Sequence, residues 1–134
     1  MQTLIVQYFP RFFLIVNGLI YAVLTGMFLF APRVWFANLG IDLVNDLGYT
    51  ELKAMYIGMM GSMALFSLLG AMQERYLEPA LVLALVSYAA LASVRSWGIL
   101  VEELFDSFTL QLLYAELASA AAAALALLCR HRAC

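Results

Sequence analysis

The 134-residue sequence contains few of the residue types that do chemistry in enzymes and metalloproteins. It has a single histidine, His131, and two cysteines, Cys129 and Cys134, which lack C-x-x-C spacing. This composition argues against a histidine–cysteine metal set and against a dithiol redox couple. The sequence also shows no glycine-rich phosphate loop and no nucleophile paired with a base. We therefore expect no cofactor and no metal, and catalysis is the least supported class of function.

Charged residues are equally scarce. They make up 12% of the chain, hydrophobic residues make up 66%, and the formal net charge is -2. Ordinary globular domains contain about a quarter charged and about half apolar residues. No run of lysine and arginine is present that could bind the phosphates of a nucleic acid. A soluble domain of this size could not hide so much apolar surface, so we expect one integral membrane domain over residues 1–134.

Four apolar stretches are long enough to cross a lipid bilayer as helices, which takes about 20 residues each. They cover residues 12–30, 52–72, 79–100 and 108–128. The connections between the last three stretches are short, which predicts antiparallel neighbours. The predicted fold is therefore all-α: an antiparallel up-down four-helix bundle in a membrane, with both termini on one side.

The connection between the first two spans, residues 31–50, is longer and contains Trp35 and Phe36 among polar residues. Tryptophan and tyrosine prefer the headgroup level of a membrane. This pattern predicts a short interfacial helix that lies across one end of the bundle.

The distribution of basic residues predicts the orientation of the bundle, because lysine and arginine favour the cytoplasmic side. The end that carries the termini has four of them: Arg11, Arg75, Arg130 and Arg132. The opposite end has Arg33 and Lys53. We therefore expect a multi-pass protein with both termini in the cytoplasm.

Arg95 is a basic residue inside the otherwise apolar third span. Arg95 and Glu116 lie equally far from the turn between the third and fourth spans, so they should face each other. Arginine keeps its proton, and its planar fork suits a carboxylate, which makes Glu116 the predicted partner. Tyr56 and Tyr88 could add hydroxyl groups, and Glu51 lies within reach of an extended arginine.

These five residues, Glu51, Tyr56, Tyr88, Arg95 and Glu116, form a predicted polar cluster with more than one interpretation. The cluster can be a latch that fixes the register of the helices, since a lone charge inside a membrane is unfavourable. It can also line an outward-facing pocket that recognises a polar headgroup. A third arrangement has Arg95 extending alone to the lipid headgroups.

Small residues recur at every fourth position in three of the spans, a spacing that lets helices pack closely in membranes. These small-residue stripes are Gly18, Ala22 and Gly26; Ala54, Gly58 and Ser62; and Ala115, Ser119 and Ala123. We expect them to pack the bundle, with a self-association surface as the alternative.

Two further features predict packing rather than a binding site. Met55, Met59 and Met63 recur every four residues, which is more typical of packing or lipid contact than of soft-metal ligands. Asn17, in the first span, predicts a hydrogen bond between helices.

The second span begins with "ELKAMYIGMMGSMALFSLLGA", residues 51–71, and the connection before it contains "APRVWFANLGID". These segments, with Arg95 and Gly98 late in the third span and Glu116 early in the fourth, resemble domain-of-unknown-function family 4345. That family consists of small bacterial membrane proteins with four spans. The resemblance covers most of the chain and departs at Ile57, where the family often has glycine. It implies the four-span fold and a bacterial inner-membrane location, and it brings no activity.

The leading hypothesis is a non-enzymatic membrane protein. In one version it is a module whose cluster around Arg95 binds a lipid or a hydrophobic or anionic small molecule. In the other version it is an accessory subunit of a larger membrane complex or homo-oligomer. An apolar bundle core with a few convergent polar groups suits such a pocket. The alternative is a small proton-coupled transporter that works as a dimer, with Glu116 as its proton carrier. A charge pair with Arg95 would keep Glu116 ionised and oppose that role.

Overall fold

The computed structural model describes residues 2–103 and 106–133, and 90% of the chain is helical. In chain order the elements are α1 (Gln2–Phe30), α2 (Pro32–Asn38), α3 (Asp46–Lys53), the π-helical segment η1 (Ala54–Met59), α4 (Met60–Met72), α5 (Glu74–Leu100) and α6 (Ser107–Ala133). The elements α3, η1 and α4 follow one another without interruption and form one continuous rod. The predicted all-α fold is confirmed.

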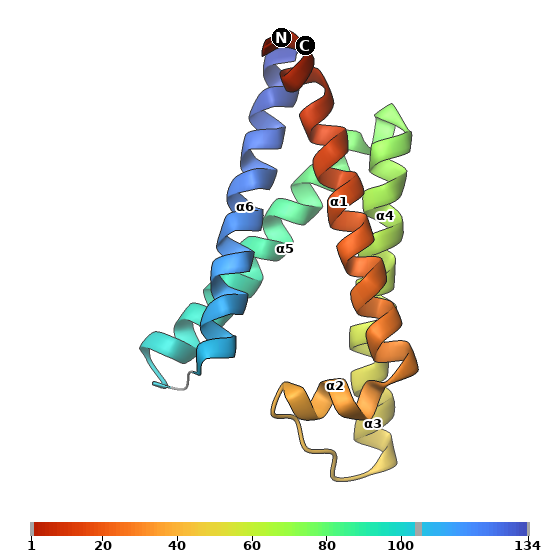
Figure 1. The fold of residues 1–134 in the computed structure, drawn as a ribbon, viewed down its shortest axis with the longest axis vertical. Helices are drawn as coiled ribbons and strands as arrows, with labels where there is room; N and C mark the ends of the chain where they lie inside the picture. Colours follow the sequence, from red (N-terminus) through yellow and green to blue (C-terminus); the bar gives the residue numbers. More distant parts are fainter. Residues whose placement is uncertain (1, 104–105, 134) are drawn as a thin grey trace.

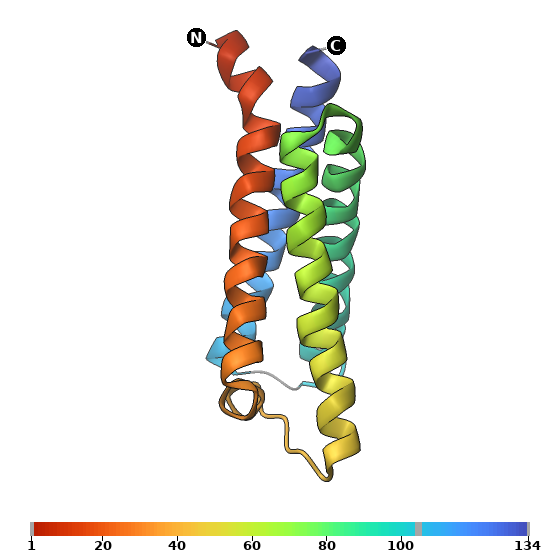
Figure 2. The same ribbon diagram turned by 90° about the vertical axis from the view of Figure 1, so that its right-hand side faces the viewer.

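The long helices form an antiparallel up-down bundle with both ends of the chain at the same end (Figure 1). The terminal end carries the chain ends and the turn at Gln73, and the loop end carries α2 and the last residues of α5. The most extensive contacts are between α1 and α4 and between α5 and α6. Figure 2, turned by 90°, shows α1 and α4 in front with α5 and α6 behind them.

Four helical stretches are long and apolar enough to cross a membrane. They are Leu4–Phe30, Asp46–Met72, Glu74–Leu100 and Ser107–Arg132. Each is longer than the span that the sequence predicts, because the residues flanking each predicted span continue the helical backbone. Large apolar side chains lie on the outside of the bundle, for example Phe30 at 87%, Leu100 at 79% and Met72 at 77% exposed. Such a surface is compatible with a lipid environment.

The helices approach each other most closely at the terminal end. A Cβ atom added to Gly70 of α4 would lie 2.5 Å from the Cβ of Ala80 in α5. A Cβ atom added to Gly18 of α1 would lie 2.8 Å from the Leu68 side chain of α4. The core at this end consists of Leu14, Ala71, Leu77, Ala80, Leu81 and Ala126. Small residues at these crossings thus let the helix backbones come together, as expected for helices that pack in lipid.

Toward the loop end, the α5–α6 pair separates from α1 and from the α3–η1–α4 rod (Figure 1). Burial follows the same trend. Ala92 is the last buried residue of α5, and Glu116 is the first buried residue in the described part of α6. The bundle is therefore closed at the terminal end and divergent at the loop end.

The short helix predicted in the first connection is α2, which crosses the loop end roughly perpendicular to α1 (Figure 1). Pro32 occupies its first turn, where the missing N–H is harmless. Gly40, with a φ of +73°, allows the chain to turn away just after the helix ends. Phe36 is fully buried, with its ring 5.2 Å from that of Phe28. This aromatic contact fixes α2 against the end of α1.

Most members of the predicted small-residue stripes lie on the surface of the bundle. The packing prediction is wrong for the exposed members, Ala22, Ala54, Gly58, Ser62 and Ala115. Gly18 and Ala123 are buried, and Gly26 and Ser119 are half-buried. A four-residue spacing identifies one face of a helix but does not say whether that face points inward.

The second span departs furthest from its stripe because it contains the π-helical segment. Between Ala54 and Met59 the backbone has i→i+5 hydrogen bonds and more residues per turn than an α-helix. The residues before this segment are therefore rotated relative to those after it. A stripe counted with the α-helical period therefore does not indicate which face of the bundle this segment presents, and Ala54, Gly58 and Ser62 are all exposed.

Candidate functional site

The interior of the bundle holds polar side chains from all four long helices. They include Asn17, Tyr21, Ser67, Tyr88 and Glu116, each at most 9% exposed. Asn17 Nδ2 donates a hydrogen bond to Ser67 Oγ at 2.9 Å, and the Tyr88 hydroxyl donates to Asn17 Oδ1. Buried polar groups persist when they are hydrogen-bonded in this way. Asn17, Ser67 and Tyr88 thus link α1, α4 and α5, and we call them the central polar chain.

Tyr88 belongs to this chain rather than to the surroundings of Arg95. Its ring stacks on that of Tyr21, with 6.1 Å between the centroids. The sequence places Tyr88 on the same helix face as Arg95, but the Tyr88 hydroxyl is already bonded to Asn17. The hydrogen bond between helices that the sequence predicts for Asn17 is present.

Arg95 of α5 and Glu116 of α6 form a two-pronged ion pair. Arg95 Nε donates to the two Glu116 carboxylate oxygens at 3.1 and 3.0 Å, and Arg95 Nη2 donates to Oε1 at 2.8 Å. The Glu116 side chain is 10% exposed and that of Arg95 is 27% exposed. The pair lies at the level where the two helix pairs begin to separate, so it is buried on one side and accessible on the other.

One edge of the Arg95 guanidinium is left without a partner. The group has five N–H donors in a fixed plane, and Glu116 occupies the edge formed by Nε and Nη2. Nη1 forms no hydrogen bond with residues 2–103 or 106–133, and it is not enclosed by them. Nη1 can therefore donate two further hydrogen bonds to an acceptor that reaches the 27% exposed Arg95 side chain.

Two other members of the predicted cluster occupy different positions. Tyr56, in η1, lies close enough to influence Arg95 electrostatically, while its ring packs on Phe28 at 4.7 Å and on Phe36 at 5.4 Å. Glu51 is exposed on α3, and the prediction that it reaches Arg95 is wrong. The α3–η1–α4 rod diverges from α5 toward the loop end, which carries Glu51 away from the ion pair.

A second ionic cluster, which the sequence does not predict, closes the terminal end. Glu74, at the start of α5, forms salt bridges with Arg11 of α1 and with Arg130 of α6. Arg11 Nη1 also donates to the Ala71 carbonyl at 2.7 Å, which caps the end of α4. Opposite charges near the same end of three spans could have suggested this contact. Its geometry holds α1, α5 and α6 together at this end.

The described residues contain no group of three or more histidine, cysteine, aspartate or glutamate side chains that could hold a metal ion. Met55 and Met59 are exposed, and Met63 is half-buried beside Ser87. The methionine stripe therefore faces partly outward and does not converge on one point.

The fold and the site together define a class: a helical bundle with four potential membrane spans and a partly accessible Arg95–Glu116 ion pair between two of them. No protein-family model, no curated protein and no solved structure matches the chain. Membership of domain-of-unknown-function family 4345 stays a prediction. The function is therefore inferred from the geometry of the site.

Proposed function

We propose that the chain is a multi-pass membrane protein that binds an amphiphile, a lipid or another small molecule with a polar head, beside Arg95. The length and apolar surface of the four helices support the membrane location. The excess of arginine at the terminal end supports cytoplasmic termini, and the family resemblance suggests a bacterial inner membrane. The ligand would lie between the two helix pairs at the loop end.

The free edge of Arg95 is the observation that carries this proposal. A contact that only fixes the helix register needs the Nε/Nη2 edge of the Arg95 guanidinium, which bonds Glu116. It does not explain the Nη1 donors, which have no partner there. In a membrane, polar groups without a partner are unfavourable, since no water is available to bond them. An oxygen atom of a bound amphiphile would satisfy the Nη1 donors.

The net charge of the Arg95–Glu116 pair determines which polar headgroup of a ligand can bind beside it. Glu116 already neutralises Arg95, so a second full negative charge would leave the site with a net negative charge in a poorly solvated place. A neutral or zwitterionic acceptor, such as an ester or ketone carbonyl, avoids this penalty. We therefore place neutral carbonyl compounds ahead of the anionic ligands that the sequence also allows.

Native mass spectrometry from mild detergent tests the proposal, because it detects co-purified ligand and oligomeric state together. The wild type is compared with Arg95→Lys, which can still pair with Glu116 but lacks the second edge. The control is Arg132→Lys, at the opposite end of the bundle. We expect ligand on the wild type and the control, and none on Arg95→Lys.

A variant that removes both charges, Arg95→Leu with Glu116→Leu, separates binding from folding, since it leaves no unpaired charge. It should retain helix content and lose the ligand. Ligand at wild-type stoichiometry on this double variant would overturn the proposal.

The exposed small residues favour a second candidate, an accessory subunit or homo-oligomer. The outer face of α6 presents Ala115, Ala118 and Ala121, all exposed. Small residues of this kind allow another helix to approach closely in a membrane. If this face is an interface, Ala118→Trp should abolish the stoichiometric complex seen by native mass spectrometry. The matched change Leu65→Trp, at a large exposed residue of α4, should leave it intact.

A further inference from the structure

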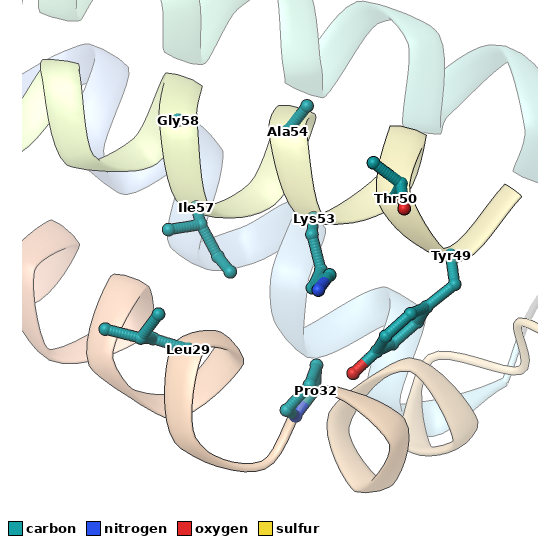
Figure 3. A pocket seen from close by; sticks show the side chains of 8 residues that line it. All are labelled: Leu29, Pro32, Tyr49, Thr50, Lys53, Ala54, Ile57 and Gly58. Atoms are coloured by element: carbon teal, nitrogen blue, oxygen red, sulfur yellow. The ribbon is translucent and has the colours of Figure 1, made fainter. Parts of the chain in front are cut away.

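A shallow groove of about 420 Å³ lies at the loop end, away from the Arg95 ion pair in sequence (Figure 3). The end of α1, the start of α2 and the α3–η1 rod enclose it. Its apolar wall includes Leu29 and Ile57, which face each other across one part of the groove. Tyr49 and Lys53 line the other part, so the groove joins an apolar wall to a polar mouth.

Two cations share the ring of Tyr49: Lys53, which lines the groove, and Arg33, which follows the lining residue Pro32 in α2. Arg33 Cζ lies 4.6 Å and Lys53 Nζ 4.5 Å from the centroid of the Tyr49 ring. Cation–π contacts of this kind hold both charges near the ring without neutralising them. Two positive charges are thus concentrated beside an apolar wall.

The nearby acids compensate these charges only weakly. The Arg33 side chain is 68% exposed, and its acidic neighbour Asp46 is 3.9 Å away and 99% exposed. Such an exposed pair contributes little. Lys53 forms no ion pair with the described part of the chain, and Glu51, two positions earlier, projects from the opposite side of the helix. The mouth of the groove can therefore accept an anion.

The π-helical segment shapes the wall of the groove. Ala54, Ile57 and Gly58 all belong to η1 and all line it. A Cβ atom added to Gly58 would have no atom within 4 Å, so the space beside it is open. π-Helical turns are rare and occur frequently at functional sites. The groove thus coincides with the one such turn in the described chain.

The position of the groove suits a lipid of the adjacent leaflet. Leu29 is near the end of the first apolar stretch, Leu4–Phe30, and Arg33 follows it in α2. If the four helices cross a membrane, the cations lie at headgroup level and the apolar wall faces the acyl chains. A free anion would use the cations and would leave the apolar wall without a contact.

We propose that this groove binds an anionic phospholipid, with Arg33 and Lys53 bonding its phosphate and its first acyl carbons lying against Leu29 and Ile57. This site is separate from the Arg95 site. It depends on the membrane location in the proposed function and does not depend on amphiphile binding at Arg95. Arginine and lysine near a membrane surface each attract an anionic headgroup by about 1 kcal/mol, which is about a fivefold change in affinity.

The test is a titration of detergent-solubilised protein with phosphatidylglycerol or phosphatidylcholine, read by native mass spectrometry at fixed salt. We expect phosphatidylglycerol to bind more tightly than phosphatidylcholine. Arg33→Gln or Lys53→Gln should weaken it about fivefold, and the double variant about thirtyfold. The control removes the same charge at the terminal end, Arg75→Gln with Arg132→Gln, and should have no effect. Equal binding to the wild type and the Arg33/Lys53 double variant would overturn the proposal.

Two further arms separate a lipid from a free phosphate and from the Arg95 site. Gly58→Leu fills open space in the wall without touching the cations, and it should weaken phosphatidylglycerol binding. Unchanged binding to Gly58→Leu, or full displacement by millimolar inorganic phosphate, would overturn the lipid assignment. Arg95→Lys should leave phosphatidylglycerol binding unchanged, so that failure of one site is distinguishable from failure of the other. Helix content measured by circular dichroism confirms that each variant is folded.

Discussion

Arg95 and Glu116 lie 21 positions apart in the chain and meet edge to edge, with the guanidinium Nε contacting both carboxylate oxygens at 3.1 and 3.0 Å. The pair ties α5 to α6 at the level where these helices separate from α1 and the α3–η1–α4 rod. It therefore combines a structural contact with an accessible donor edge, and variants at this pair can separate the two roles.

Removal of one charge should be worse than removal of both. Arg95→Leu leaves the Glu116 carboxylate buried and unpaired, and we expect a loss of about 3 kcal/mol in the free energy of unfolding. Arg95→Leu with Glu116→Leu should recover most of that loss, since no charge remains. Equilibrium unfolding in mixed detergent micelles measures the free energy of unfolding of the single and the double variant. Equal losses in the two variants would contradict the contribution of the ion pair to stability.

Replacement of Gly70 at the α4–α5 crossing should destabilise the fold, because the added Cβ of Gly70→Ala would lie 2.5 Å from the Ala80 Cβ. We expect a loss of about 1–3 kcal/mol in unfolding free energy from the resulting overpacking. Gly26→Ala is the matched control, because nothing lies within 4 Å of its added carbon. That control should be neutral or stabilising by up to about 1 kcal/mol, through helix propensity. Similar effects at both positions would argue against the close crossing.

The central polar chain predicts a specific role for one hydroxyl group. Tyr88→Phe removes the donor to Asn17 Oδ1 and leaves that buried oxygen with a missing bond. We expect a loss of about 1–2 kcal/mol in unfolding free energy. Tyr114→Phe, at an exposed position on α6, serves as the control and should change it little. No difference between the two variants would mean that the hydrogen bond contributes nothing.

The start of α6 should depend on pH. Hydrogen bonds from the Thr109 side chain and backbone lower the pKa of Asp106 below its usual 3.8, and its Oδ1 accepts from Thr109 N at 2.7 Å. A lowered pKa means that the cap stabilises the folded state above pH 3.8, and that this is lost as the pH falls through the lowered value. Amide hydrogen exchange in the first turn of α6 should therefore show reduced protection in strong acid, after correction for intrinsic exchange. Asp106→Asn, which caps without titrating, should remove this dependence; persistence of the dependence would exclude Asp106 as its cause.

The proton-coupled transporter hypothesis is tested by the same ion pair. Both Glu116 oxygens accept bonds from Arg95, so proton uptake would have to break the pair. We expect no proton-driven flux in proteoliposomes. Flux that is present in the wild type and absent in Glu116→Gln would replace the binding proposal with transport.

The sequence predicts the helices and their order well, because apolar length and short connections depend on local composition alone. The level of Arg95 and Glu116 also follows from counting residues along an antiparallel hairpin, since both helices rise equally per residue. These features need no knowledge of how the four helices are rotated.

Features that depend on helix rotation could not be predicted. The π-helical turn rotates the residues before it relative to those after it, and no spacing rule indicates where such a turn lies or that Ala54 and Gly58 are exposed. The divergence at the loop end separates Glu51 from Arg95, although both lie near the same end of their helices. Tyr88 bonds Asn17 because α1 lies on that side of α5, which hairpin counting does not specify.

Glu74 holds Arg11 and Arg130 at the terminal end, and the close crossing at Gly70 lies beside it. Any tilting of the helix pairs relative to each other would thus pivot about that end. Displacements would grow with distance from the pivot, so they would be larger at the level of Arg95 than at Gly70. If the four helices cross a membrane as proposed, a hydrophobic ligand would enter between the helix pairs sideways from the bilayer, without passing through an aqueous channel.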